Sequence, residues 1–306
     1  MRVELINLPF SNVFRRRLDP PMYLLQLAPR LEKQGFKVRI NDLNGIEKNM
    51  WSFGNCVLYV MYVDRKGFST AKRIARECRA MNDNCIIMAC GSGPSKDVTT
   101  FLNDDLFDVV IRGEAENAIK LFIQDTFQGR KTEMKQVYKA DVRNLNELPL
   151  PSRHLIDIGS YNRKLSDRKA VMVMTTRGSP FRTTWLCSGL KTFGIRRVMN
   201  EVMGVVTAYG IKNFYFGDEA FCFDKHRAVD IAKALHENGL SFGFNDVITN
   251  VNIELLKKLA DLGCKELTLN PYGASSQALV DSMKAKIEEE TGVRVILRHD
   301  GKYPKK

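Results

Sequence analysis

The stretch TTRGSPFRTTWLCSG occupies residues 175–189 and directly follows the apolar run Ala170–Met174. A short apolar run bounded by turn residues predicts a buried strand, and the Arg-Gly and Ser-Pro pairs after it predict a loop. Ser188 and Gly189 lead into a polar, basic segment before the next helix. We therefore expect a loop at the end of a strand, and strand ends are where α/β barrels build their sites.

Size and composition predict a folded protein with two domains. The chain has 306 residues, of which 44% are hydrophobic and 27% charged, and this length accommodates two domains with separate cores. No run of about 18 apolar residues is present to span a bilayer, and the amino terminus lacks the apolar segment of a signal peptide. We therefore expect a cytoplasmic protein with no membrane partner.

The chain is basic, with 47 Lys and Arg against 35 Asp and Glu and a formal net charge of +12. A basic surface attracts phosphates and nucleic acids. The excess charge is spread over several short clusters, aromatic residues are not interleaved with them, and no RNA-binding motif accompanies them. The composition favours a solvated basic surface, with a phosphate-bearing or nucleic-acid partner as the alternative.

Seven cysteines are scattered singly along the chain, and no two have the spacing of a zinc knuckle or a redox pair. Several lie inside apolar runs, which favours buried, reduced thiols that pack as small hydrophobic side chains. They are Cys56, Cys78, Cys85, Cys90, Cys187, Cys222 and Cys264.

Residues 1–127 alternate between apolar runs and helical patterns. Strands joined by helices of this length predict right-handed crossovers and a parallel sheet. We therefore expect an α/β fold whose first domain is a doubly wound, Rossmann-like sheet of five strands. The expected strands are Val3–Leu8, Val38–Leu43, Val57–Val63, Ile86–Ala89 and Val109–Arg112. One helix is expected to begin after Pro20-Pro21, and three more are expected at 70–81, 98–102 and 116–125.

In such a sheet a ligand binds beyond the carboxyl ends of the strands, near the point where the strand order switches. Three loops are expected there: Pro9–Pro21, Asp64–Ser69 and Gly91–Ser95. Glycines in such loops let the backbone approach a large flat ligand, but they are equally ordinary turn formers. Both interpretations of Gly91 and Gly93 stay open at this point.

Residues 128–170 are expected to form a linker, because they contain a polar stretch and then a Leu-Pro-x-Pro segment. His154 lies in this linker, and a hydrogen-bonded histidine is favoured over a cofactor ligand. Residues 171–306 are expected to form the second domain, with four or five strands. The expected strands are 170–174, 214–216, 242–244, 266–269 and 293–297, and the expected helices are 196–209, 224–238, 253–262 and 284–290.

The order of motifs in the first domain resembles the cobalamin-binding domain of radical S-adenosylmethionine enzymes. The motifs are Pro20-Pro21 before a helix, Gly35-Phe36-Lys37-Val38 leading to Asp42, the Gly91–Pro94 turn, and Arg112-Gly113-Glu114-Ala115-Glu116. None of the four histidines lies in this domain, so no histidine from it would bind the cobalt. Glu114 and Glu116 also suit the start of a helix, where the dipole favours acidic side chains. The resemblance implies cobalamin bound by loops that contain Pro9, Asp64, Gly91, Gly93, Pro94, Gly113 and Glu114.

The second domain is similar to the barrel of the same family, where Cys-Pro-Phe-x-Cys-x-aromatic-Cys holds a 4Fe-4S cluster through three thiolates. Here Ser179, Thr183 and Leu186 occupy the cysteine positions, and Cys187 lies one place beyond the third. Cluster iron is held by thiolates, so we expect the family's cluster to be absent. The resemblance also implies contacts to S-adenosylmethionine from Asp218, Glu219, Gly273, Ser275 and Ser276.

Two functions from different classes follow from this resemblance. As an enzyme, the chain would belong to the cobalamin-dependent radical S-adenosylmethionine family, whose members methylate or rearrange unactivated carbon of a small molecule or peptide. Methyl transfer by a corrinoid is the part of this chemistry that needs no cluster. As a binding protein, the chain would keep the corrin and offer the open strand edge of a partial TIM-type barrel to a protein partner. A basic scaffold that binds neither cofactor is a third reading.

Overall fold

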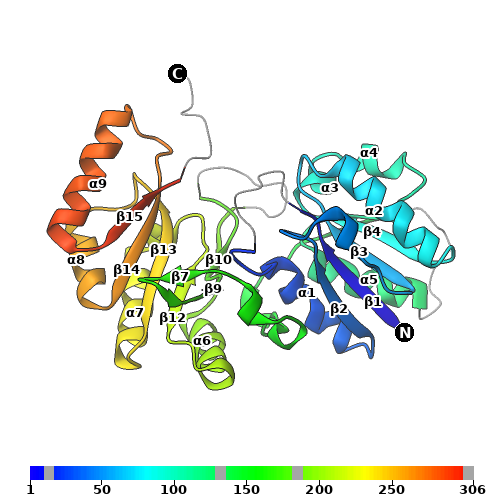
Figure 1. The fold of residues 1–306 in the computed structure, drawn as a ribbon, viewed down its shortest axis with the longest axis horizontal. Coiled ribbons are helices and arrows are strands. Elements are labelled where there is room, and N and C mark those ends of the chain that lie inside the picture. Colours follow the sequence, from blue (N-terminus) through cyan, green and yellow to red (C-terminus); the bar gives the residue numbers. More distant parts are fainter. Residues whose placement is uncertain (10–16, 128–135, 181–188, 299–306) are drawn as a thin grey trace. The chain divides into compact units, whose positions relative to one another are not determined.

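A computed structural model describes residues 1–9, 17–127, 136–180 and 189–298 of the chain (Figure 1). These residues divide into two compact units, one that ends at Asn162 and one that begins at Arg163. Each unit is built on its own parallel sheet. Within the described residues, no helix is long and apolar enough to cross a membrane.

The first unit contains a six-stranded sheet in the order β2-β1-β3-β4-β5-β6, with every neighbouring pair parallel. The chain passes from β1 to β2 on one side and then to β3 on the other side of β1, so the sheet is doubly wound. Its strands are β1 (Arg2–Asn7), β2 (Lys37–Asp42), β3 (Leu58–Tyr62), β4 (Ile86–Cys90), β5 (Val109–Gly113) and β6 (Gln136–Ala140). Its helices are α1 (Met22–Glu32), α2 (Phe68–Met81), α3 (Ser92–Lys96), α4 (Val98–Leu102) and α5 (Ala115–Phe127), with 3-10 turns η1 (Lys48–Met50), η2 (Leu145–Glu147), η3 (Arg153–Leu155) and η4 (Ile158–Ser160).

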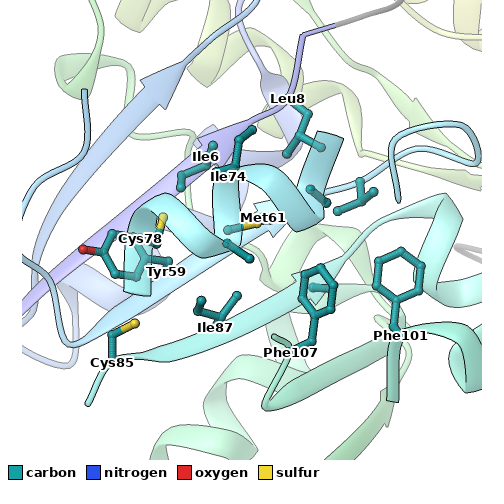
Figure 2. Packing of buried hydrophobic residues seen from close by; sticks show 14 of the residues in the cluster. Ile6, Leu8, Tyr59, Met61, Ile74, Cys78, Cys85, Ile87, Phe101 and Phe107 are labelled. Atoms are coloured by element: carbon teal, nitrogen blue, oxygen red, sulfur yellow. The ribbon is translucent and has the colours of Figure 1, made fainter. Parts of the chain in front are cut away.

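The strands of this sheet are apolar in long runs because helices cover the sheet. Helix α1 packs against α5. Side chains from four strands and α2, among them Ile6, Tyr59, Ile74 and Ile87, belong to one buried cluster (Figure 2). Burial of these side chains fixes the strands, and thereby the loops that follow each strand at its carboxyl end.

Strand β6 corrects the sequence-based expectation of five strands followed by a linker at residue 128. It pairs with β5 from Val109 opposite Gln136 to Gly113 opposite Ala140. The sequence QVYKA follows a polar stretch, so no apolar run predicts it. Tyr138 anchors the strand, because its buried ring meets the Phe122 ring of α5 edge-on at 5.9 Å.

The second unit contains a five-stranded parallel sheet whose strands follow chain order from β9 to β15. All five predicted strands are present, and helix α9 begins well before the charged segment 284–290 that predicted it. The strands are β9 (Val171–Val173), β12 (Asn213–Phe216), β13 (Ser241–Val247), β14 (Cys264–Asn270) and β15 (Arg294–Leu297), and the helices are α6 (Ile195–Tyr209), α7 (Lys225–Glu237), α8 (Ile253–Asp261) and α9 (Gln277–Thr291). Two hairpins, β7 (Lys164–Leu165) with β8 (Arg168–Lys169) and β10 (Thr176–Arg177) with β11 (Lys191–Thr192), and the turn η5 (Phe221–Phe223) complete the unit.

Alternation of side chains along each strand separates the two faces of this second sheet. Phe216 and Phe244 lie on one face, fully buried, and the ring of Phe221 stacks on Phe216 at 4.8 Å. Tyr215 points to the opposite face, where its hydroxyl lies 2.6 Å from Oδ1 of Asn245. One face therefore forms the apolar core, and the other carries polar side chains.

Candidate functional site

The carboxyl ends of the strands in the first sheet share one edge, and the strand order switches between β1 and β3. Ligands of doubly wound sheets bind outside this edge, at the switch point. Asn7, the last residue of β1, pairs with Asp42 of β2 on one side and with Tyr62 of β3 on the other. These three positions mark the candidate site of the first unit.

Asp42 anchors a hydrogen-bond network on the β2 side of the switch point. Its Oδ1 accepts from the Asn7 amide at 2.7 Å, and its Oδ2 accepts from the Tyr161 hydroxyl at 2.9 Å. Arg17 donates to the Asp42 carbonyl oxygen at 3.2 Å. Burial, and then the adjacent Asp42 carboxylate, raise the pKa of Tyr161. Tyr161, which belongs to the expected linker, thus covers this part of the edge. The sequence contains no signal that pairs Tyr161 with Asp42.

The β3 side of the switch point carries two stacked tyrosines. The Tyr62 ring, at the end of β3, lies 5.2 Å from the Tyr23 ring in the first turn of α1, and their planes differ by 10°. Both side chains are half-buried. Aromatic rings with a polar edge suit a pocket for a flat ligand. The sequence does not reveal this pair, because its members belong to different elements.

Gly91 and Gly93 bring the loops after β3 and β4 together. A Cβ atom on Gly91, whose φ is +109°, would lie 2.6 Å from the Val63 carbonyl oxygen. A Cβ atom on Gly93 would overlap the Asp64 carbonyl oxygen. The Gly93 amide also donates to the Val63 carbonyl at 3.0 Å. Close packing of the chain against the loop after β3 therefore requires both glycines. Helix α3 replaces most of the open loop expected at Gly91–Ser95.

The other residues predicted for the cobalamin site lie along the same edge. The Glu114 carboxylate accepts from the Val142 amide at 2.8 Å, which ties the segment after β6 to the end of β5. Asp64 caps its own loop, because its carboxylate accepts from the Lys66 amide at 2.9 Å. The structure thus gives two of these residues local partners, and contact with a corrin stays a prediction. The edge positions are Pro9 after β1, Asp64 after β3, Pro94 in α3, and Gly113 and Glu114 at the end of β5.

His154 is hydrogen-bonded, as predicted for a linker histidine. Its Nε2 lies 2.7 Å from Oε1 of Glu32, the last residue of α1. Helix α1 begins at the carboxyl edge of the sheet and runs back toward the amino edge, so Glu32 and His154 lie at the end of α1 away from the switch point. His154 is therefore not placed to bind a metal at that switch point.

In the second unit, the loop that resembles the cluster loop directly follows β9. Ser179, at the first cysteine position, is 3% exposed, while Thr183, Leu186 and Cys187 lie outside the described residues. A hydroxyl is a far weaker ligand for cluster iron than a thiolate. Within the described ranges, no group of three or more His, Cys, Asp or Glu side chains could hold a metal ion. The residue types at the cluster positions do not fit an iron-sulfur cluster.

Asp218, predicted to contact S-adenosylmethionine, is buried against the start of this loop. Its carboxylate accepts from the amides of Thr175 and Thr176, both at 2.8 Å, and from the Thr175 hydroxyl. Burial raises the pKa of Asp218, while these hydrogen bonds and the charge of Arg227 oppose the increase. The structure therefore gives Asp218 a positioning role that the sequence does not indicate.

Asp246, at the carboxyl end of β13, is a second buried carboxylate that the sequence does not single out. It accepts from the amide of Cys222 at 2.5 Å and from the side chain of Asn250 at 2.9 Å. Burial raises its pKa to about 6. Asp246 thereby ties the loop after β12, which also contains Asp218, to the loop after β13.

The remaining residues predicted to contact S-adenosylmethionine are spread along the carboxyl edge of the second sheet. Glu219 is half-buried after β12, whereas Gly273 and Ser275 are exposed after β14. Ser276 caps α9, because its hydroxyl accepts from the Leu279 amide at 3.2 Å. Strand β13 lies between β12 and β14, so these residues follow strands that are not neighbours, and their shared contact with S-adenosylmethionine stays a prediction.

The polar face of the second sheet contains a network that sequence reasoning missed. The Tyr215 hydroxyl bonds to the side chains of Asn245 and Thr268. The guanidinium of Arg163 lies over the Tyr215 ring, 3.9 Å from its centroid. These residues come from β12, β13, β14 and the segment before β7, and no sequence motif connects them.

Comparison with known proteins identifies the fold. No protein-family model matches the chain. An uncharacterized methyltransferase of Pyrococcus horikoshii is 27% identical over 316 residues, which cover 91% of this chain and 67% of that protein. The radical S-adenosylmethionine methyltransferase TsrM of Kitasatospora setae matches 97% of this chain with a TM-score of 0.69 and 15% identity. The cobalamin-dependent S-adenosylmethionine radical enzyme OxsB matches 97% with a TM-score of 0.71 and 16% identity.

The chain has the fold of these enzymes. One structure of TsrM contains its substrate tryptophan with an analogue of S-adenosylmethionine, another contains cobalamin and a [4Fe-4S] cluster, and OxsB contains aqua-cobalamin and S-adenosylmethionine. The chain spans 67% of the TsrM chain and 48% of the OxsB chain. At such low identity the likeness establishes the fold, and the cofactors of this chain depend on its own residues.

Proposed function

We propose that the chain binds a corrinoid at the carboxyl edge of its first sheet and takes part in methyl transfer without an iron-sulfur cluster. The observation that carries the proposal is the switch of strand order between β1 and β3, with the stacked rings of Tyr23 and Tyr62 beside it. A corrin is a large flat ring, and a switch point in a doubly wound sheet is the usual place for a flat cofactor. The fold of the cobalamin enzymes and the relative named as a methyltransferase support the same proposal.

The residues at this edge suit a corrin that receives no histidine from the first unit. His154 is engaged with Glu32 at the other end of α1, so shape and backbone contacts would hold the ring. Asp42 and Asn7 are already hydrogen-bonded to each other, which leaves the β3 and β4 side for the ligand. When bound, cobalamin supplies a carrier for a methyl group, and S-adenosylmethionine is the donor that the fold suggests.

A second candidate is a corrinoid-binding protein without catalysis. Ser179 in the first cluster position favours it, because a buried hydroxyl there does not replace a thiolate. In that case the free edge of β15, which pairs only with β14 among the described strands, would be covered by a protein partner. The substrate of the catalytic alternative would be a small molecule or a peptide.

Corrin and iron measurements on one preparation test the proposal. The full chain is incubated with hydroxocobalamin, desalted, and examined by absorption and by cobalt analysis. A parallel anaerobic sample is treated with iron and sulfide. We expect cobalt equimolar with protein and iron far below it. Loss of all cobalt on desalting would refute corrin binding, whereas several iron atoms per chain would refute the absence of a cluster.

Two tryptophan substitutions at opposite ends of β4 test the location. Ser92 follows the strand at the proposed site, and Asn84 precedes it at the other edge of the sheet. Ser92→Trp should abolish corrin retention by filling the site, and Asn84→Trp should leave it unchanged. Circular dichroism confirms that both variants fold. Equal retention in the two variants would place the corrin elsewhere.

A further inference from the structure

The short strands β10 and β11, on either side of residues 178–190, form a neck in the second unit. Strands β10 and β11 pair antiparallel there, with Thr176 opposite Thr192 and Arg177 opposite Lys191. One step farther from the loop, the Phe193 amide donates to the Thr175 carbonyl at 2.9 Å. The two ends of residues 178–190 are therefore held side by side by backbone hydrogen bonds.

Arg227 of α7 joins both sides of this neck. Its Nη2 donates to the Thr175 carbonyl at 2.8 Å and to the Phe193 carbonyl at 2.9 Å, and its Nη1 donates to the Thr175 hydroxyl at 3.2 Å. The planar guanidinium presents several donors in a fixed arrangement, so one side chain bridges two carbonyls that belong to opposite ends of the loop.

Asp218 completes the arrangement from the end of β12. Its carboxylate accepts from the amides of Thr175 and Thr176, on the strand that enters the loop. Asp218 also interacts electrostatically with Arg227, so the buried carboxylate and the half-buried guanidinium balance each other's charge. Burial makes such charge-assisted hydrogen bonds strong and makes the loss of one partner costly.

We propose that Arg227 and Asp218 are positioning residues that clamp the neck of the loop, so that hydrogen bonds of the protein, and not a metal cluster, set where residues 178–190 leave the sheet. The clamp uses only residues outside the cluster positions. It explains how the loop entrance keeps a defined geometry although Ser179 stands where the resemblance places a cysteine. Any effect of the clamp on S-adenosylmethionine rests on the proposed function, whereas the clamp itself does not.

Amide hydrogen exchange on the full chain tests the clamp. The neck is followed through peptides that contain the amides of Thr175, Thr176 and Phe193, and a peptide from α8 (253–261) reports on the unit as a whole. Arg227→Met removes three hydrogen bonds, so exchange at the neck should accelerate at least about tenfold, with α8 unchanged. Arg227→Lys should restore part of the protection, because an ammonium can reach one carbonyl.

Matched variants separate a local clamp from general destabilisation. Lys233→Met changes an exposed cation on the same helix and should leave the neck unchanged. Thr175→Val keeps the side-chain shape but removes one hydroxyl, and should accelerate neck exchange less than Arg227→Met. Unchanged neck exchange in both Arg227→Met and Thr175→Val, or equal acceleration in α8, would overturn the clamp. If Arg227→Met does not fold, the exchange rates at the neck in Arg227→Lys, Thr175→Val and wild type decide the question. Faster exchange in both variants than in wild type supports the clamp, and equal rates overturn it.

S-adenosylmethionine binding, measured by calorimetry on the same proteins, provides a separate readout. If wild type binds the ligand, Arg227→Met should weaken binding at least about fivefold while Lys233→Met does not. If wild type binds no S-adenosylmethionine, the proposed methyl donor is wrong. The hydrogen-exchange result still tests the clamp independently of that outcome. Ligand affinity that is unchanged in Arg227→Met would show that the clamp does not position this site.

Discussion

Alanine substitutions at three glycines of the first unit should separate backbone strain from close packing. Gly35 has φ +83° and nothing within 4 Å of an added Cβ atom. Gly93 lacks a positive φ, but its Cβ atom would overlap the Asp64 carbonyl oxygen. Gly91 combines φ +109° with a contact of 2.6 Å to the Val63 carbonyl oxygen. The three positions thus represent strain alone, collision alone, and both.

The expected losses follow from these geometries. A non-glycine residue in the left-handed region costs roughly 1–2 kcal/mol, which we expect for Gly35→Ala. Forcing an extra carbon into a packed backbone contact costs roughly 1–3 kcal/mol, which we expect for Gly93→Ala. Gly91→Ala should therefore lower the free energy of unfolding by roughly 2–5 kcal/mol, the largest loss of the three.

Urea unfolding followed by tryptophan fluorescence measures these differences. The chain has two tryptophans, so a Trp185→Phe background leaves Trp51 as the reporter of the first unit. The Trp51 indole donates to the Ile46 carbonyl at 3.1 Å and its ring lies 4.5 Å from the Arg73 guanidinium, so its emission should change on unfolding. If Gly91→Ala and Gly93→Ala are no less stable than Gly35→Ala, the packing argument is wrong, and ligand approach becomes the better explanation of both glycines.

Three further predictions concern titration and anchoring. Burial raises the pKa of Asp246 to about 6, so between about pH 4 and 6 the folded state binds a proton that the unfolded state does not. The free energy of unfolding, relative to that of Asp246→Asn, should therefore fall by roughly 3 kcal/mol as the pH rises through this window. A difference that does not change with pH in urea titrations would contradict this. Tyr161→Phe removes the hydroxyl bond to buried Asp42 and should lower the unfolding free energy by about 1–3 kcal/mol, measured in the same urea assay; no change would show that the contact is not stabilising. His154→Ala removes a largely exposed pair with Glu32 and should cost less than about 1 kcal/mol with corrin retention unchanged, and loss of corrin would show that His154 is a ligand.

Apolar patterning predicts most of the secondary structure because it reflects burial directly. The runs that become β1 to β5, and β9, β12, β13, β14 and β15, lie where the sequence places them, since buried parallel strands need continuous apolar residues. The cysteines follow the same rule. Those in the described ranges are free and buried, and burial raises the pKa of Cys56 to about 11 and of Cys264 to about 12. Burial of the cysteine side chains is therefore confirmed for the described positions.

Features that depend on partners far apart in the chain could not be predicted in this way. Strand β6 pairs with β5 and is anchored through Tyr138, whose ring contacts Phe122 and whose hydroxyl donates to Asp125 at 3.0 Å, but its own sequence is too polar to stand out. Asp218 is singled out by its motif, but its hydrogen-bond partners and Arg227 emerge only when β9, β12 and α7 are brought together. The sequence therefore identifies candidate site residues by their type, whereas tertiary contacts determine which groups each of these residues binds.

The Tyr161–Asp42 contact has a practical consequence for dividing the chain. A fragment cut at residue 127 would lose β6, so β5 would become a bare strand edge, and buried Asp42 would lose its phenol donor. Both losses favour aggregation or partial unfolding. A fragment that ends at Asn162 retains both stabilising features. Isolated first units prepared for spectroscopy should therefore be terminated after Asn162.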